Sequence, residues 1–185
     1  MPRRSLDSAV LALDLGTSSV RTALFDAKAQ PIPDSGASQT YRMRHTAEHG
    51  AELDPAVLLR ATRKCLHQTC RLTTQRPRAI AGSAFWHSLL GLDRAGEPLT
   101  PVYTWADDRS ATAVDALRAE LDEAALHDRT GCVIHTSYWP AKLRWLATEQ
   151  PDLAVAKVRY VGYGDYLLAR LTGRLVTSVA MASGT

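Results

Sequence analysis

The chain has 185 residues, 45% of them hydrophobic, and its 22 basic and 19 acidic residues give a formal net charge of +3. This length and composition suit a globular domain with a sizeable core and exclude disordered and fibrous proteins. The charges are scattered, with short basic pairs at Arg3-Arg4 and Arg76/Arg78, so we expect no nucleic-acid partner. Apolar runs are too short for a signal peptide or for the roughly 20 residues of a membrane span, so we expect no membrane association.

The first half predicts antiparallel strands followed by a helix. Val10–Leu13 is a continuous apolar run, typical of a strand covered on both faces, and Val20–Phe25 predicts the returning strand. A third, more polar strand is expected at Gln39–His45. Asp54-Pro55 then opens a helix, with Asp as the N-cap and Pro at the first position. Further strands are expected at two segments, Arg78–Phe85 and Ser88–Leu92.

The second half predicts mainly helices. Helical spacing runs through four segments: Arg109–Leu121, Glu123–Asp128, Pro140–Thr148 and Asp165–Leu171, the last ended by Gly173. Val158–Val161 predicts a short buried strand and Leu175–Thr177 a short extended piece. This order of elements indicates a mixed α/β fold.

Cysteine usage fits a reducing compartment. Cys65, Cys70 and Cys132 cannot all pair with one another, and the first two fall on diverging faces of a predicted helix. We therefore expect reduced thiols in a cytoplasmic protein rather than disulfides or a metal site.

The turn between the first two strands carries residues that suit phosphate. Asp14 ends the first strand, and Gly16, Thr17 and Ser18 follow it. A Walker A loop needs a Lys and a following helix, and a dinucleotide fingerprint needs three glycines, so both are excluded. A hairpin turn can instead offer backbone N–H groups and hydroxyls to phosphate oxygens, with Asp14 holding a hydrated Mg²⁺. From spacing alone, a plain hairpin with a solvated turn is an equal alternative.

Segments along nearly the whole chain resemble the FGGY family of carbohydrate kinases. "LDLGTSSVRTALFD" is similar to the first phosphate loop of that family, "AFWHSLLGLD" to its sugar-contacting segment and "YTWADDRS" to its Trp-x-Asp-x-Arg segment. "RTGCVIHTSYWPAKLRWL" and the final segment, with its Ala-Ser-x-Thr ending, extend the likeness. The resemblance implies an α/β, ribonuclease-H-like domain of the actin and hexokinase type, with a mixed β-sheet flanked by helices. Residues 1–185 would form an incomplete N-terminal domain, without the C-terminal domain.

On the nucleotide side, the resemblance implies ATP and Mg²⁺ as cofactors. Asp14 matches the acid that interacts with the metal and the transferring phosphate. Gly16, Thr17 and Ser18 match the loop around the ATP phosphates. Arg21 matches a family arginine near that loop, with an exposed strand charge as the alternative.

On the sugar side, the resemblance implies that Trp86 and His87 contact the substrate, with a core aromatic and a buried histidine as the alternative. Trp105, Asp107 and Arg109 suit polyol recognition, because an indole stacks on C–H groups while an acid and a guanidinium bind hydroxyls. A buried structural Asp107–Arg109 ion pair is the equal alternative.

Two further features come from the helix expected at Pro140–Thr148. Tyr138, just before it, lies within one position of a family tyrosine that lines the sugar site. Lys142 and Arg144 are expected on the solvated face of this helix, whose other side carries apolar residues, Leu143 and Leu146.

The implied activity is ATP-dependent phosphorylation of a sugar, sugar acid or polyol hydroxyl. The segments around His87 and Trp105 favour gluconate, with xylulose next, and Trp86-His87 replaces the Arg-Glu pair of glycerol kinases. The aspartate base of the family belongs to a segment beyond Thr185, so we expect no catalytic residue here, negligible activity of these residues alone, and self-association through exposed apolar surface. A non-catalytic sugar-binding or regulatory half-domain and an actin-like ATPase module are the alternatives.

Overall fold

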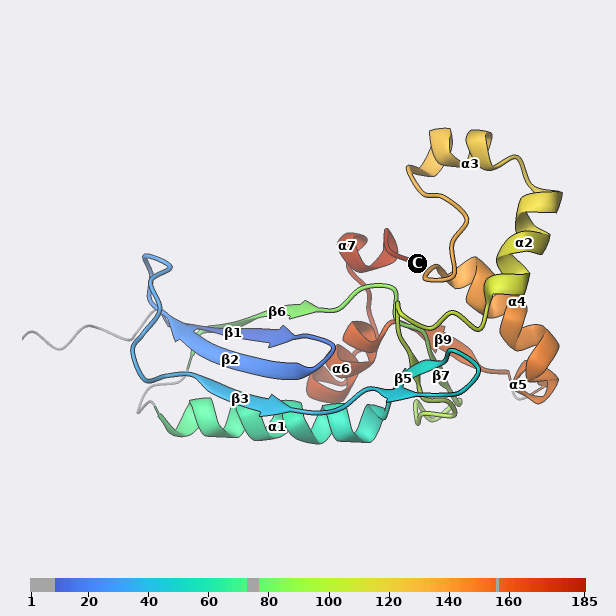
Figure 1. Ribbon diagram of the computed structural model, residues 1–185. Helices are drawn as coiled ribbons and strands as arrows, with labels where there is room; N and C mark the ends of the chain where they lie inside the picture. Colours follow the sequence, from blue (N-terminus) through green and yellow to red (C-terminus); the bar gives the residue numbers. More distant parts are fainter. Residues whose placement is uncertain (1–8, 73–76, 156) are drawn as a thin grey trace, which may run out of the picture. The chain divides into compact units, whose positions relative to one another are not determined.

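The computed structural model describes residues 9–72, 77–155 and 157–185, and their contacts group into two compact units (Figure 1). The first unit comprises the chain up to Arg42 together with Ala56–Phe85. The second comprises Met43–Pro55 and Trp86–Thr185. Of the basic pairs noted in the sequence, Arg3-Arg4 and Arg76 lie outside the described residues.

The first unit contains a four-stranded sheet in the order β3-β2-β1-β6. Its antiparallel members are β1 (Val10–Leu15), β2 (Ser19–Phe25) and β3 (Ala37–Thr40), whereas β6 (Ala79–Ala84) runs parallel to β1. The chain reaches β6 through α1 (Pro55–Arg71), because a parallel pairing needs a crossover of a dozen or more residues. The mixed sheet and this helix were both predicted from the sequence.

Hydrogen bonds join α1 to the sheet. The buried face of the helix carries five residues: Leu58, Leu59, Thr62, Cys65 and Thr69. The hydroxyl of Thr22 on β2 shares a 2.6 Å hydrogen bond with the hydroxyl of Thr69 and donates to the carbonyl oxygen of Cys65 at 3.3 Å. These contacts satisfy polar groups that would otherwise be costly inside the core.

β1 is buried on alternate residues, not on both faces as its continuous apolar run indicated. Leu11, Leu13 and Leu15 are buried, while Val10 and Ala12 are half-buried and Asp14 is exposed. The error arose because a short apolar run hides its period of two when small side chains occupy the less buried face.

The second unit contains short strands and most of the helices. Its strands are β4 (Arg44–His45), β5 (Ala51–Leu53) and β8 (Val102–Tyr103), in the order β4-β5-β8, and the pair β7 (Leu90–Leu92) and β9 (Arg159–Val161). Its helices are α2 (Ala111–Glu120), α3 (Glu123–Thr130), α4 (Trp139–Glu149), α5 (Pro151–Val155), α6 (Tyr163–Thr172) and α7 (Val179–Ala182). Buried Leu89, Tyr103 and Leu146 form one core cluster.

Two of the predicted strands need correction. The strand expected at Gln39–His45 is divided into β3 and β4, which belong to different units. Leu175–Thr177 lies in none of the described strands. In the structure Cys65, Cys70 and Cys132 are not joined by disulfides. Among the described residues, no helix combines the length and apolar character that crossing a membrane requires.

The packing of α1 predicts a matched pair of substitutions. Leu58 is fully buried, whereas Arg63 of the same helix is exposed. Leu58→Ala should lower the free energy of unfolding by about 2–5 kcal/mol, because it removes buried methyl groups and leaves a cavity. Arg63→Ala should change it by no more than about 0.5 kcal/mol. Urea unfolding followed by circular dichroism measures both, and equal effects would contradict this packing.

Candidate functional site

The turn between β1 and β2 is short and tightly closed. The N–H of Gly16 donates to the carbonyl oxygen of Ser19 at 2.9 Å. A Cβ at position 16 would lie 3.3 Å from that same oxygen, so glycine allows the chain to turn this closely. Thr17 is half-buried and Ser18 is exposed. The predicted phosphate-binding residues therefore lie together on one hairpin turn.

Asp14 and Arg21 flank this turn on opposite strands. The β1–β2 register pairs them directly, so their side chains project from the same face of the sheet. Both residues are exposed. A single exposed carboxylate beside a turn suits Mg²⁺, which keeps most of its waters and takes only one or two protein carboxylates. Within the described ranges, no three His, Cys, Asp or Glu side chains gather closely enough to hold a metal ion.

Tyr41, which the sequence did not single out, holds the turn at two points. Its hydroxyl donates to the carbonyl oxygen of Gly16 at 2.5 Å, and its backbone N–H donates to that of Ser18 at 3.0 Å. Burial raises the Tyr41 pKa, and the nearby Asp14 carboxylate raises it further. The phenol therefore stays protonated as a donor. Because Tyr41 directly follows β3, these two hydrogen bonds fix the turn against the end of the third strand.

In the second unit, three predicted sugar-site residues form an aromatic cluster. The His87 ring lies 5.6 Å from that of Trp86 and 4.9 Å, edge to face, from that of Tyr138. Nδ1 of His87 forms a 2.7 Å hydrogen bond with the carbonyl oxygen of Gly184. A Cβ at Gly184 would lie 3.3 Å from the Trp86 ring, so the indole packs on bare backbone.

His87 has a φ of +56°, a left-handed conformation that non-glycine residues rarely adopt. Such backbone strain persists only where the surroundings enforce it, and it is frequent at binding sites. Trp86 is 47% exposed. The cluster therefore presents aromatic surface to solvent from a constrained backbone.

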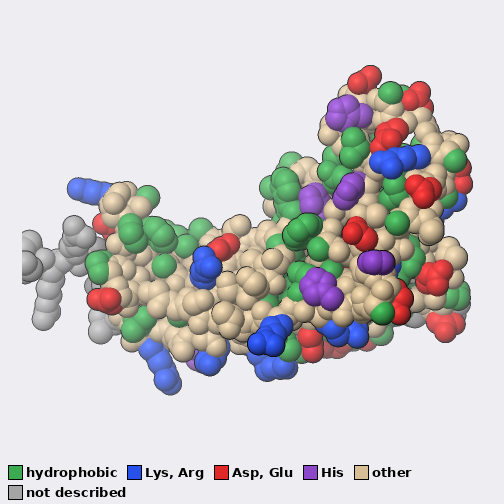
Figure 2. Space-filling model, in the orientation of Figure 1, with side chains coloured by type: hydrophobic (Ala, Val, Ile, Leu, Met, Phe, Trp, Pro, Cys, Tyr) green, Lys and Arg blue, Asp and Glu red, His purple; other side chains and the backbone are tan. Residues whose placement is uncertain are grey.

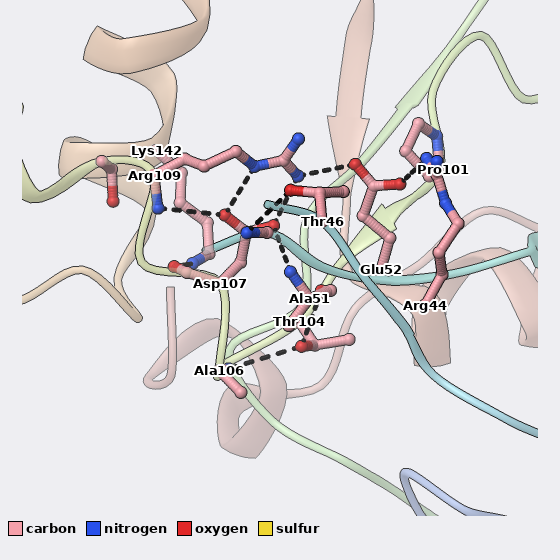
Figure 3. A network of polar contacts seen from close by, with 12 residues as sticks. Arg44, Thr46, Ala51, Glu52, Pro101, Thr104, Ala106, Asp107, Arg109 and Lys142 are labelled. Atoms are coloured by element: carbon pink, nitrogen blue, oxygen red, sulfur yellow. Dashed lines mark hydrogen bonds and ion pairs between the residues drawn. The ribbon is translucent and has the colours of Figure 1, made fainter. Parts of the chain in front are cut away.

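Asp107 and Arg109 form the buried ion pair that the sequence left open as an alternative (Figure 3). Asp107 is only 2% exposed. Arg109 donates to its two carboxylate oxygens from Nε at 3.1 Å and from Nη2 at 2.5 Å. Nη2 also lies 2.7 Å from a carboxylate oxygen of Glu52, which in turn pairs with Arg44.

The Arg109 guanidinium also stacks on aromatic rings, 5.2 Å from the centroid of Tyr103 and 4.7 Å from that of Trp145. A Cβ at Gly50 would lie 2.8 Å from its central carbon, so this position needs glycine for the guanidinium to fit. The side chain of Arg109 retains 14% exposure. Most of its hydrogen-bonding capacity is therefore directed into the protein.

Trp105, two residues before Asp107, is 50% exposed. Its carbonyl oxygen accepts a 2.8 Å hydrogen bond from the hydroxyl of Ser137, the residue before Tyr138. The backbone that carries Trp105 is thereby joined to the backbone that carries Tyr138. The structure thus brings together Trp86, His87 and Tyr138 as one cluster and connects Trp105 to it through a neighbouring residue.

The prediction that Lys142 lies on a solvated helix face was wrong. Lys142 is 1% exposed, and its ammonium donates to the carbonyl oxygens of Asp107 at 3.1 Å and Thr136 at 2.7 Å. It lies one turn before buried Leu146, whereas Leu143 is only half-buried. Arg144 does lie on the outer face, in a two-bond ion pair with Glu120 at 2.6 Å.

Charged side chains of both signs are spread over the face shown in Figure 2.

Tyr138 borders an apolar cavity of about 400 Å³, lined mainly by side chains of α2, α3 and the loop after α3. This lining offers few hydrogen-bonding groups to a polar ligand.

Residues 9–185 match the model of the FGGY family of carbohydrate kinases, N-terminal domain. The chain belongs to this family. A gluconokinase of Bacillus subtilis is 29% identical over 184 residues, covering 97% of this chain and 35% of the relative. A xylulose kinase of Streptomyces rubiginosus is 34% identical over 180 residues, covering 95% of this chain and 36% of the relative.

Solved structures of sugar kinases share the fold. The gluconate kinase of Lactobacillus acidophilus has a TM-score of 0.89 at 28% identity, covering 96% of this chain and 36% of that one. The ligand-bound xylulose kinase of the same organism has a TM-score of 0.90 at 28% identity, with the same coverage. The predicted ribonuclease-H-like α/β fold is confirmed. This FGGY chain spans about a third of the length of the curated relatives it matches.

The environment of Lys142 predicts a pH dependence of stability. Burial lowers its pKa from 10.5 to about 8, although Asp107 and Asp108 oppose this shift. Between these two values the unfolded chain binds more protons than the folded chain, so the free energy of unfolding rises with pH, by at most about 3 kcal/mol. Above pH 10 the raised pKa of Tyr103, about 12, acts in the opposite direction.

Urea unfolding between pH 7.5 and about 9.5 tests this contribution. Lys142→Met should remove the rise relative to the unsubstituted chain, whereas Arg144→Met, on the exposed face of the same helix, should retain it. Identical pH slopes in all three proteins would contradict the lowered pKa.

Proposed function

We propose that the chain is the N-terminal part of a kinase that transfers the terminal phosphoryl group of ATP to a hydroxyl of gluconate, with xylulose as the second candidate. The observation that carries the proposal is the family match over residues 9–185. The similarity to named gluconokinases and xylulose kinases supports both substrates. This family membership disfavours the actin-like ATPase alternative.

On the nucleotide side, the β1–β2 turn would bind phosphate. Backbone N–H groups and the hydroxyls of Thr17 and Ser18 are suitable donors, and Arg21 adds positive charge on the same face as Asp14. Asp14 would hold Mg²⁺, which when bound neutralises phosphate charge. Tyr41 holds this turn through its hydrogen bond to the carbonyl oxygen of Gly16.

On the sugar side, aromatic faces would contact the C–H groups of an open-chain polyol. These faces come from Trp86, Trp105, His87 and Tyr138. The His87 ring can also form a hydrogen bond with a hydroxyl. In this proposal the exposed edge of Arg109 contacts hydroxyls, while buried Asp107 fixes the position of Arg109 through their ion pair.

The choice between gluconate and xylulose depends on one charge. Gluconate carries a carboxylate, which favours a cation in its site, whereas xylulose is neutral. Arg109 is already paired with Asp107 and Glu52, so it offers only part of its charge to a ligand. We also propose a cytoplasmic location, which fits the free cysteines and gives access to ATP. Exposed apolar residues would allow the chain to self-associate.

Calorimetric titration of the chain with MgATP, gluconate, xylulose and glycerol tests the two binding functions. Asp14→Asn should weaken MgATP binding by about tenfold and leave sugar binding unchanged, because it removes a charged ligand of the metal. Trp105→Ala should do the reverse, since one stacking face is lost. Glycerol is the control and should bind weakest, and nucleotide binding without any sugar response would contradict the proposal.

We also expect the 185-residue chain by itself to transfer phosphate negligibly, because it spans only about a third of the length of the kinases it resembles. A coupled assay of ADP release with gluconate and xylulose measures this, with a full-length gluconokinase assayed in parallel. Turnover within about tenfold of the roughly 1–100 per second typical of kinases would refute it.

A further inference from the structure

Lys142 carries a buried positive charge that the predicted sugar site does not use directly. Its ammonium has three donors and no acceptor, and two of these donors are bonded to backbone carbonyls of Asp107 and Thr136. Burying an ammonium is costly unless hydrogen bonds compensate for the lost water. At 1% exposure, Lys142 depends on these two contacts to offset part of that cost.

The two carbonyls belong to two different segments of the second unit. We call residues 105–110 the Trp105 segment and residues 134–138 the Tyr138 segment. Besides Lys142, three side-chain hydrogen bonds join them: Ser137 Oγ to Trp105 O at 2.8 Å, Thr136 Oγ1 to Asp108 Oδ1 at 2.7 Å and Ser110 Oγ to Thr136 O at 3.2 Å. Of these contacts, only that of Lys142 is made by a third element, α4.

Asp107 is consequently held from both sides. Its carboxylate accepts hydrogen bonds from Arg109 and from the backbone N–H of Ala51 at 3.1 Å, while its carbonyl oxygen accepts from Lys142 (Figure 3). Tyr138 is the residue immediately before α4, and Lys142 follows it one helical turn later. The ammonium thus fixes the Trp105 segment relative to the beginning of the helix that follows Tyr138.

We propose that Lys142 is a positioning residue for the sugar site: by bridging Asp107 and Thr136 it sets the spacing between the Trp105 and Tyr138 segments. This inference rests on the proposed sugar-binding function of those segments. Only a long cationic side chain satisfies both carbonyls from α4, so the apolar side chain of methionine cannot replace it. Lys142 is 1% exposed, so in this proposal it acts through the two carbonyl groups and does not touch the substrate.

Calorimetry on the full 185-residue chain separates positioning from general destabilisation. Lys142→Met should weaken the binding of gluconate or xylulose by about tenfold, since misplaced contacts lose affinity without being removed. MgATP affinity should change by less than about twofold, because the β1–β2 turn shares none of these contacts. Arg144→Met, the control on the same helix, should change neither. Equal loss of sugar and MgATP affinity in Lys142→Met would overturn the proposal.

Hydrogen–deuterium exchange tests the same inference without any sugar. In Lys142→Met, amides of the Trp105 and Tyr138 segments should exchange about tenfold faster while those of β1 and β2 are unchanged. If no sugar binds to the unsubstituted chain, the proposed function fails, yet the exchange result still decides the role of Lys142. Unchanged exchange in both segments would overturn that role.

A measurement on the unsubstituted chain applies if Lys142→Met does not fold. Amides of the two segments should then open together, with protection factors that agree within about threefold, because one ammonium ties them to each other. Two unrelated levels of protection would overturn the proposal.

Discussion

Arg109 lies between the carboxylates of Asp107 and Glu52, and the geometry of the second unit around Trp105 depends on this buried pairing. Removing charges from water costs several kcal/mol per ion, and the attraction recovers that cost only when the geometry is good and the remaining polar atoms are satisfied. Here the carboxylate of Asp107 also accepts from the backbone of Ala51 on β5. The ion pair therefore connects a strand to the turn that carries Trp105.

The same network explains how exposed aromatic residues can be held in fixed positions. Large rings give a ligand contact area at little entropic cost only when the backbone beneath them is fixed. Trp105 and Trp86 are about half exposed, yet one stands on a segment held by Asp107 and Lys142, and the other packs on the backbone of Gly184. Rigid support beneath exposed side chains is the arrangement that a preorganised binding site requires.

Local sequence signals made much of the fold predictable, whereas features that depend on tertiary contacts could not be predicted. The hairpin from Val10 to Phe25 and the helix beginning at Pro55 follow from apolar runs and helix-start chemistry. Strands β4, β5 and β8 have only two or three residues each, too few for periodicity to indicate them. Tyr41 and Glu52 act through contacts with residues distant in sequence, so no spacing could identify them. Lys142 was misplaced because charge alone was weighed, although its separation of four from Leu146 put it on the buried face.

The two candidate binding functions thus rest on different physical bases. The β1–β2 turn is held by backbone hydrogen bonds and by one phenol, so its shape follows from strand register and from glycine at position 16. The sugar-side residues depend instead on buried charges whose loss would leave a partner unpaired. Substitutions at Trp86 or Trp105, whose side chains are about half exposed, should therefore cost less stability than substitutions in the layer of buried charges.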